Sequence, residues 1–225
     1  VKFSSKLEFE DKKNFGGEGA DSSFSNTAKD IKQTKDGGYI MVGSTYNNTN
    51  GDFDVWIVKF APDLTLTWEQ TIAGETAGSG AVTTGYDDFG SSIQELDNGN
   101  YLVCGTSYDV TNNDRDAMLW TIGSDGTGAA SIYNEADELS HDDCEYAEKT
   151  MDGGYIMVTT SITLSSAARD TEVIKLDKDG ALDATFTDGN LEITGSDIGV
   201  FVQERSEDGY IVVGNTQVSG RQLDA

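Results

Sequence analysis

The chain has 225 residues, 36% of them apolar, which is enough for one large β domain or two small domains. Its 40 acidic and 15 basic residues give a net charge of −25, which argues against nucleic-acid binding and against anionic membrane surfaces. No apolar run is long enough for membrane insertion, and 26 glycines beside a single proline favour many tight turns.

The first residues of the chain match a later stretch of the same chain. Val1–Phe3 matches Val58–Phe60, and the letters LEFE match LTWE after a small gap. Both pairs are predicted to be the third and fourth strands of one kind of unit. The chain is therefore expected to begin inside a unit.

A tight turn followed by an apolar strand recurs along the chain. The strands open with Tyr39, Tyr101, Tyr155 and Tyr210, which are 54 to 62 residues apart. Glycine or asparagine stands directly before each tyrosine, and both tolerate the positive φ that a tight hairpin needs. The strands are almost continuously apolar, which predicts that both of their faces are covered.

The other strands of each unit follow from the same comparison. One strand is predicted before each turn, for example over residues 28–34. A third strand begins at Asp54, Asp116 and Asp170, and a fourth follows a short polar turn, as in LTLTWEQTI, GAASIYNE and ALDATFTDGN. Each unit is thus predicted to be four antiparallel strands in up-and-down order, and no helical period is present.

A four-stranded sheet cannot cover both of its own faces, whereas sheets stacked around an axis cover one another. We therefore predict an all-β protein, a β-propeller of about four tandem four-stranded blades, rather than a sandwich or a β-helix. The first strand of each blade is expected to be innermost. The single domain or segment 1–225 divides into units at about 1–17, 28–74, 90–135, 145–194 and 198–225, the first and last being parts of a split blade.

Three arrangements of the split blade remain open. The chain is a segment of a larger propeller, a closed four-bladed ring, or one half of an eight-bladed ring made by a homodimer. The remainder of a longer chain is the favoured expectation, because a boundary in the middle of a strand leaves backbone groups unpaired.

The sequences of the repeats resemble those of a known group of proteins. KQTKDGGYIMVGST, DVWIVKF and TWEQTIAG lie in residues 32–74, and VIKLDKDGALDATF spans residues 173–186. They resemble repeat propellers of secreted and surface proteins from Bacteroidota, and their layout resembles WD-repeat and quinoprotein-like propellers. The resemblance implies the fold and an extracellular or cell-surface location, although no leader is visible, and it carries no catalytic residue.

The sequence contains no recognisable catalytic motif. Its one histidine, His141, is expected in a loop just before an inner strand, too close in sequence to Asp143 and Cys144 to face them productively. Two cysteines make no disulfide framework, and Cys104 is expected to be a small buried apolar residue. The three tryptophans are expected in the core between blades.

Oxygen-bearing side chains gather in two predicted loops. Asn50, Asp52 and Asp54 form one group, and Asn112, Asp114 and Asp116 form the other. Such ligands suit Ca²⁺, the one cofactor that the sequence suggests. The alternative is that the aspartates accept backbone hydrogen bonds where a strand begins.

Acidic residues also stand near the starts of the predicted inner strands. Asp87 and Asp88 precede one such strand, and Asp142 and Asp143 precede another. Together with Asp30 they are expected to line one mouth of the central channel and to bind a cation or a polyhydroxylated ligand. The alternative is solvated loop charge.

These observations favour a non-catalytic interaction or structural module of a secreted or cell-surface bacterial protein, which is not an enzyme and binds a protein or glycan ligand. Two alternatives stay open. One is a calcium-assisted adhesin or carbohydrate-binding module. The other is a glycoside hydrolase or lyase that uses carboxylates, because the chain has many of them.

Overall fold

A computed structural model describes residues 2–3, 9–11, 26–47, 51–72, 86–109, 113–134, 140–163, 169–186, 196–206 and 209–217. All of its regular elements are β-strands. Their bounds are β1 (Lys2–Phe3), β2 (Phe9–Asp11), β3 (Thr27–Gln33), β4 (Tyr39–Asn47), β5 (Asp52–Phe60), β6 (Leu66–Ile72), β7 (Phe89–Glu95), β8 (Tyr101–Asp109), β9 (Asp114–Ile122), β10 (Ala130–Asn134), β11 (Ser140–Lys149), β12 (Tyr155–Thr163), β13 (Arg169–Leu176), β14 (Ser196–Glu204) and β15 (Tyr210–Gln217).

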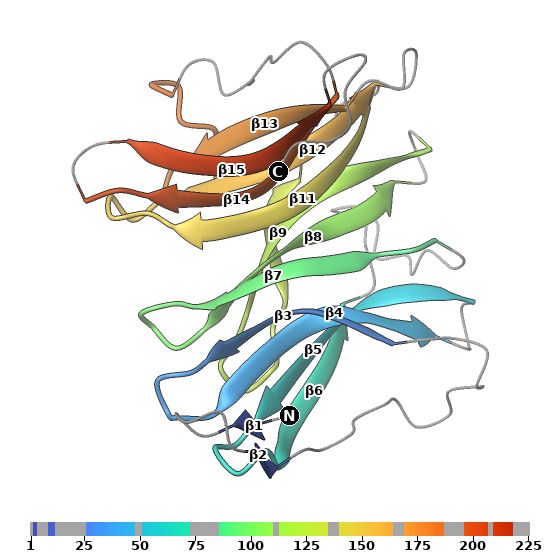
Figure 1. The fold of residues 1–225 in the computed structure, drawn as a ribbon, viewed down its shortest axis with the longest axis vertical. Helices are drawn as coiled ribbons and strands as arrows, with labels where there is room; N and C mark the ends of the chain where they lie inside the picture. Colours follow the sequence, from blue (N-terminus) through green and yellow to red (C-terminus); the bar gives the residue numbers. More distant parts are fainter. Residues whose placement is uncertain are drawn as a thin grey trace.

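The strands form antiparallel sheets that follow one another along an arc (Figure 1). We call them blade 1 (β3–β6), blade 2 (β7–β10), blade 3 (β11–β13) and blade 4 (β14–β15). Every strand in them pairs with the next strand along the chain, as up-and-down blades do. The predicted all-β propeller is confirmed.

One part of the blade pattern differs from the prediction. Up to Phe186, where this described stretch ends, the expected fourth strand of blade 3 is reduced to one bridge between Leu176 and Leu182, and a turn capped by Asp183 follows it. The segments assigned to the split blade form separate sheets: β1 pairs with β2, and β14 is the only described partner of β15. In Figure 1, β1 and β2 lie near one end of the arc, and β14 and β15 lie near the other. How the split blade is completed stays a prediction.

Apolar side chains of neighbouring blades pack face to face. Between blades 1 and 2, Ile40 and Val42 lie in one cluster with Val103 and Trp120. The clusters between blades 2 and 3 and between blades 3 and 4 are built from the same repeat positions. This packing explains why the strands are apolar on both faces. Trp120 is buried in the cluster between blades 1 and 2, and Trp68 packs against it. Trp56 is buried in a separate cluster made of blade 1 residues, so the expectation that it lies between blades is wrong.

The repeated turn has a role that sequence comparison missed. In blade 1, Asp36 Oδ2 accepts a hydrogen bond from the buried Lys59 Nζ at 2.8 Å, and Thr34 Oγ1 accepts another at 3.1 Å. In blade 3, Asp152 Oδ2 lies 2.8 Å from the equally buried Lys175 Nζ. The turn aspartate is therefore the counter-ion of a buried lysine two strands away.

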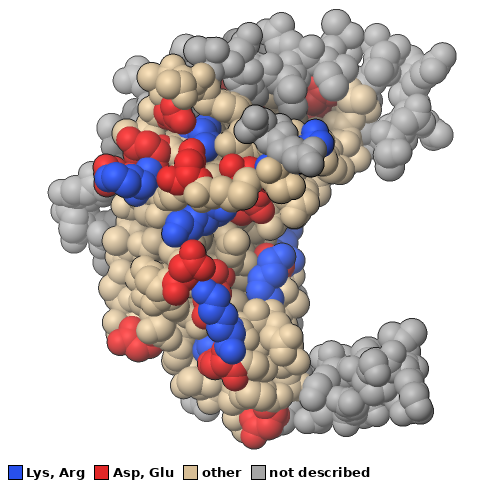
Figure 2. All heavy atoms as spheres, turned by 90° about the vertical axis from the view of Figure 1, so that its left-hand side faces the viewer, with Lys and Arg blue, Asp and Glu red and all other residues tan. Residues whose placement is uncertain are grey.

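The face that carries these turns mixes both signs of charge (Figure 2). Lys35 and Lys149 lie 3.4 and 3.8 Å from the two carboxylate oxygens of Asp97. Cations are thus paired with anions at this end of the strands. The buried aspartates described below gather at the opposite end.

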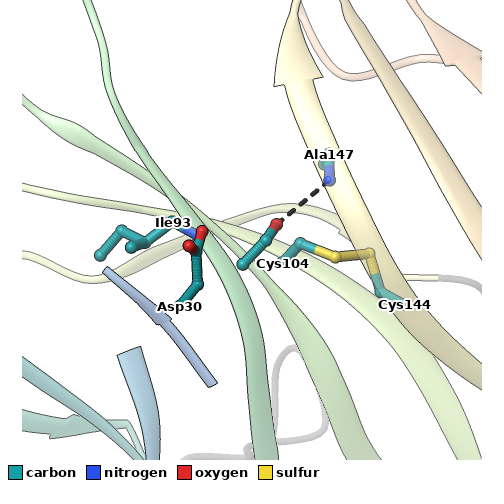
Figure 3. Close-up of a disulfide and its surroundings, with 6 residues drawn as sticks. Asp30, Ile93, Cys104, Cys144 and Ala147 are labelled. Atoms are coloured by element: carbon teal, nitrogen blue, oxygen red, sulfur yellow. Dashed lines mark hydrogen bonds between the residues drawn. A yellow bond between two sulfur atoms is a disulfide. The ribbon is translucent and has the colours of Figure 1, made fainter. Parts of the chain in front are cut away.

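A disulfide joins blades 2 and 3, and it corrects the expectation that Cys104 is merely a buried apolar residue. Cys104 of β8 is bonded to Cys144 of β11, 40 positions later in sequence, and both are fully buried (Figure 3). A hydrogen bond from the Ala147 backbone N–H to Ser92 Oγ, 3.2 Å long, links the same two blades beside it.

Candidate functional site

The buried carboxylates lie where blades meet. Each junction combines the hairpin between the second and third strands of one blade with the start of the first strand of the next. The positions repeat: Asp52 corresponds to Asp114, and Asp54 corresponds to Asp116. The starts of β7, β11 and β14 carry the corresponding residues Asp88, Asp142 and Asp197, all buried.

At the junction of blades 1 and 2, backbone N–H groups satisfy most of the carboxylates. Asp52 Oδ2 accepts from Tyr86 N at 3.1 Å, Asp87 Oδ1 from Phe53 N at 3.0 Å, and Asp88 Oδ1 from Tyr108 N at 3.1 Å. These contacts match the alternative in which aspartates anchor the starts of strands.

Asp54 completes this junction and lies next to a second carboxylate. Its Oδ2 accepts a hydrogen bond from Asn47 Nδ2 at 2.9 Å. Burial raises the pKa of Asp54, with a smaller contribution from the nearby charge of Asp52, while the Asn47 hydrogen bond opposes the shift.

The junction of blades 2 and 3 holds four buried aspartates: Asp109, Asp114, Asp116 and Asp142. Asp116 is 3% exposed and is hydrogen-bonded to the side chain of Asn134. Burial, followed by repulsion from the other three carboxylates, raises the pKa of Asp116 to about 7. One carboxyl group is therefore half protonated near neutral pH beside acidic neighbours.

The residues around His141 lie elsewhere than expected. His141, Asp142 and Asp143 are inside β11 and not in a loop before it, because this strand begins at Ser140. His141 Nδ1 accepts from the Arg115 backbone N–H at 3.1 Å, and the Arg115 guanidinium lies 3.1 Å from Asp143 Oδ2. This histidine and this carboxylate thus tie β11 to the hairpin of blade 2.

Asp30 lies within β3 and connects two inner strands. Its Oδ2 accepts from the Ile93 backbone N–H of blade 2 at 3.1 Å (Figure 3). Its Oδ1 lies 3.3 Å from Lys32 Nζ. Ser92 occupies the same repeat position in blade 2 and makes the equivalent bond to Ala147 N. Asp30 therefore has a partner between blades, away from the junction aspartates.

The calcium sites remain a prediction. Asn50 and Asn112 lie outside the described residues. Within the described ranges, no group of three or more His, Cys, Asp or Glu side chains is arranged to hold a metal ion. Asp52, Asp54, Asp114 and Asp116 lie in pairs at two different junctions. Asp52 accepts from a backbone N–H and Asp54 from the Asn47 side chain.

Sequence reasoning missed Asp197. It stands 13 residues before Tyr210, as Asp88 and Asp142 stand 13 before their own tyrosines, so alignment of the repeats would have found it. It lacks the acidic neighbour in sequence that drew attention to the other two.

Comparisons with known proteins concern the fold. No protein-family model and no curated protein matches the sequence. An endo-arabinase from Bacteroides thetaiotaomicron matches with 10% identity and a TM-score of 0.47 over 85% of this chain and 70% of that one. A mutant GH32 β-fructofuranosidase from Bombyx mori, in complex with sucrose, matches with 9% identity and a TM-score of 0.47 over 84% of this chain and 42% of that one.

Both matched structures are propeller glycoside hydrolases, and this corrects two expectations. They count against the expected non-catalytic module and against the expectation that the chain is not an enzyme. The propeller part of the expected resemblance is confirmed, whereas nothing supports its WD-repeat or quinoprotein part. Identities of 9 and 10% show a shared fold alone, so the activity is argued below from this chain's own residues.

Among the described residues, no helix has the length and apolar character needed to cross a membrane.

Proposed function

We propose that this chain carries the acid–base carboxylates of a glycoside hydrolase, with Asp116 as the proton donor. The observation that carries the proposal is the cluster at the junction of blades 2 and 3. Hydrolysis of a glycosidic bond needs one protonated and one ionised carboxyl group side by side. Burial together with like charge is the usual way in which a protein keeps these two states apart.

The roles follow from the environments of the four groups. Asp116, with its pKa raised to about 7, protonates the oxygen of the leaving group. An ionised neighbour, Asp114 or Asp142, then acts as the base that activates water or as the nucleophile. The separation of the two carboxylates in the complex with substrate would decide between inversion and retention.

The proposed location is an oxidising compartment outside the cytoplasm. The buried disulfide between Cys104 and Cys144 supports it, since such bonds form and persist in secreted and periplasmic proteins. A glycan substrate, which a secreted protein meets outside the cell, is the proposed partner.

The test is a screen of the purified chain against nitrophenyl glycosides and polysaccharides, with release of reducing ends as the readout. Asp116→Asn should lower kcat by about 10²–10⁴-fold with little change in KM, because general acid catalysis contributes that much. The wild-type rate should fall as pH rises through about 7, since the acid loses its proton. Asp179→Asn, in an exposed turn, is the matched control and should keep full activity.

Two results would contradict the proposal. One is the absence of release from every substrate by the folded wild-type chain. The other is an Asp116→Asn variant that is as active as the control.

A further inference from the structure

We propose that the cavity between blades 3 and 4 binds a small polyol of about one sugar ring through Asp197. The cavity has a volume of about 220 Å³. Its lining includes Thr171 of β13, Asp197 and Ile198 of β14, and Val212, Asn215 and Thr216 of β15. It lies at a different junction from Asp116, so the proposal does not depend on catalysis there.

Asp197 is the observation that points to a ligand. It is 4% exposed, and neither of its carboxylate oxygens has a hydrogen-bond partner. The corresponding aspartates do have partners: Asp88 accepts from Tyr108 N at 3.1 Å, and Asp142 accepts from Ser140 Oγ at 2.9 Å. A buried carboxylate that accepts nothing costs folding free energy, and a ligand that donates to it offsets that cost.

A second group in the cavity narrows the class of ligand. Thr216 Oγ1 is also buried without a hydrogen-bond partner. Thr216 of β15 stands directly opposite Asp197 of β14 in the register of the two strands. A hydroxyl both donates and accepts, and so does the side-chain amide of Asn215. An ammonium ion can only donate hydrogen bonds, so it would offer no acceptor to the Thr216 hydroxyl or the Asn215 amide. The hydroxyl groups of a polyol can both donate and accept, so they match the carboxylate and these two groups.

The size and the remaining lining agree with a small neutral ligand. Pockets for drug-sized molecules measure about 300–1,000 Å³, so a cavity of about 220 Å³ suits a single ring. Ile198 and Val212 provide apolar surface for ring carbons. Asp197 is the only charged side chain in the described lining, so a metal ion would lack the further carboxylates that it prefers.

The experiment is ligand-observed NMR on the full chain with a panel of methyl pentosides and hexosides. At least one should bind the wild type, and Asp197→Asn should weaken that binding at least tenfold. The Asp197→Asn variant should still fold, because the substitution removes a buried charge and keeps the side-chain shape. Asp179→Asn should bind like the wild type.

The Asp116→Asn variant separates this proposal from the proposed hydrolase. In the Asp116→Asn background, adding Asp197→Asn should weaken glycoside binding by the same factor as it does in the wild type, whether or not the wild type hydrolyses any substrate. Absence of binding for the whole panel, or equal binding by Asp197→Asn, would overturn the polyol site. Displacement of the glycoside by millimolar ethylammonium would assign the cavity to organic cations instead.

Discussion

Asp116 is a carboxyl group whose protonation is coupled to folding. An unfolded aspartate has a pKa of about 3.9, and in the folded chain burial and the neighbouring carboxylates raise it to about 7. The folded state therefore binds this proton more tightly. The associated stability is fully present below pH of about 4 and is lost as pH rises through about 7.

Replacing Asp116 by Asn should remove this part of the pH dependence. We expect the free energy of unfolding of the wild type to fall, relative to the variant, between pH 4 and pH 7. Urea unfolding at several pH values measures it. Parallel curves for the two proteins would contradict the assigned pKa.

The ion pair of Asp36 and Lys59 is expected to contribute to the free energy of unfolding, because it compensates a lysine charge buried at the edge of the core. The Lys59 amine is buried, and its hydrogen bonds, together with those of Thr34 and Gly38, lower the pKa of Asp36 to about 2. Asp36→Asn should destabilise the chain by about 1–2 kcal/mol. This is less than the roughly 3–5 kcal/mol for a fully buried pair, because the Asp36 side chain is 63% exposed and screened by water.

The double variant Asp36→Asn with Lys59→Met is the control, and it should recover most of the loss because no charge is left buried. The stability from Asp36 should persist down to about pH 4 and be lost as pH falls through about 2. If the double variant were less stable than Asp36→Asn, the unpaired charge of Lys59 would not be the cause of the stability loss in Asp36→Asn.

The lysine pair shows what a fuller comparison of the repeats could have predicted. Copies 1 and 3 carry threonine, aspartate, glycine and lysine at the four positions concerned, whereas copy 2 carries Leu96, Asn98, Asn100 and Thr121. These residues change together, which indicates contact. The turn positions alone do not reveal this contact, because the lysine lies 23 residues from its aspartate in sequence.

At the scale of the element, Gly38 is required by the strand next to it. A Cβ at this position would lie 2.3 Å from the Phe60 carbonyl oxygen and 2.7 Å from Lys59 Nζ. Gly38→Ala should therefore destabilise blade 1 by about 1–3 kcal/mol through overpacking. Asn100→Ala is the matched control in blade 2, where Thr121 stands in place of the buried lysine, and should change stability by less than about 0.5 kcal/mol in thermal unfolding.

If both substitutions had the same effect, the close approach of lysine would not be the reason for glycine at this turn.

The disulfide is a second test at this scale, since it connects β8 to β11. Replacing both Cys104 and Cys144 by serine should lower the free energy of unfolding by roughly 2–4 kcal/mol, as the cross-link spans 40 residues. Urea unfolding of the variant and of the wild type, each with and without dithiothreitol, measures the loss. Reductant should affect the wild type alone, and a variant as stable as the wild type would contradict a stabilising bond.

The strands themselves could be predicted from the sequence, but this bond could not. Tyrosines at regular spacing locate the second strand of each blade, and the apolar runs locate the third. Cys104 and Cys144 occupy different repeat positions, one in a second strand and one in a first. Their Cα atoms come within 5.8 Å only because neighbouring blades pack at a particular offset, and that offset has no signal in the spacing.

The whole molecule decides how much a repeat position contributes to stability. Ile211 and Val213 of blade 4 are 51 and 54% exposed, whereas the corresponding Ile40 and Val42 of blade 1 are fully buried. Ile40→Ala should cost about 2–5 kcal/mol, and Ile211→Ala less than about 1.5 kcal/mol. Chemical denaturation of the two variants measures the difference, and equal losses would indicate that blade 4 is covered in solution.

The contacts at one inner-strand position give the blades a fixed order. Asp30, Ser92 and Tyr146 stand at the same place in successive repeats, yet the first accepts a bond from Ile93 N, the second from Ala147 N, and the third packs its ring 4.3 Å from that of Phe201. Similar repeats in one chain risk stacking on the wrong neighbour while they fold. Because Asp30 and Ser92 accept backbone N–H bonds whereas Tyr146 packs on an aromatic ring, blade 4 stacked on blade 1 or 2 would lose the ring contact with Tyr146. That mis-stacked arrangement is thereby disfavoured.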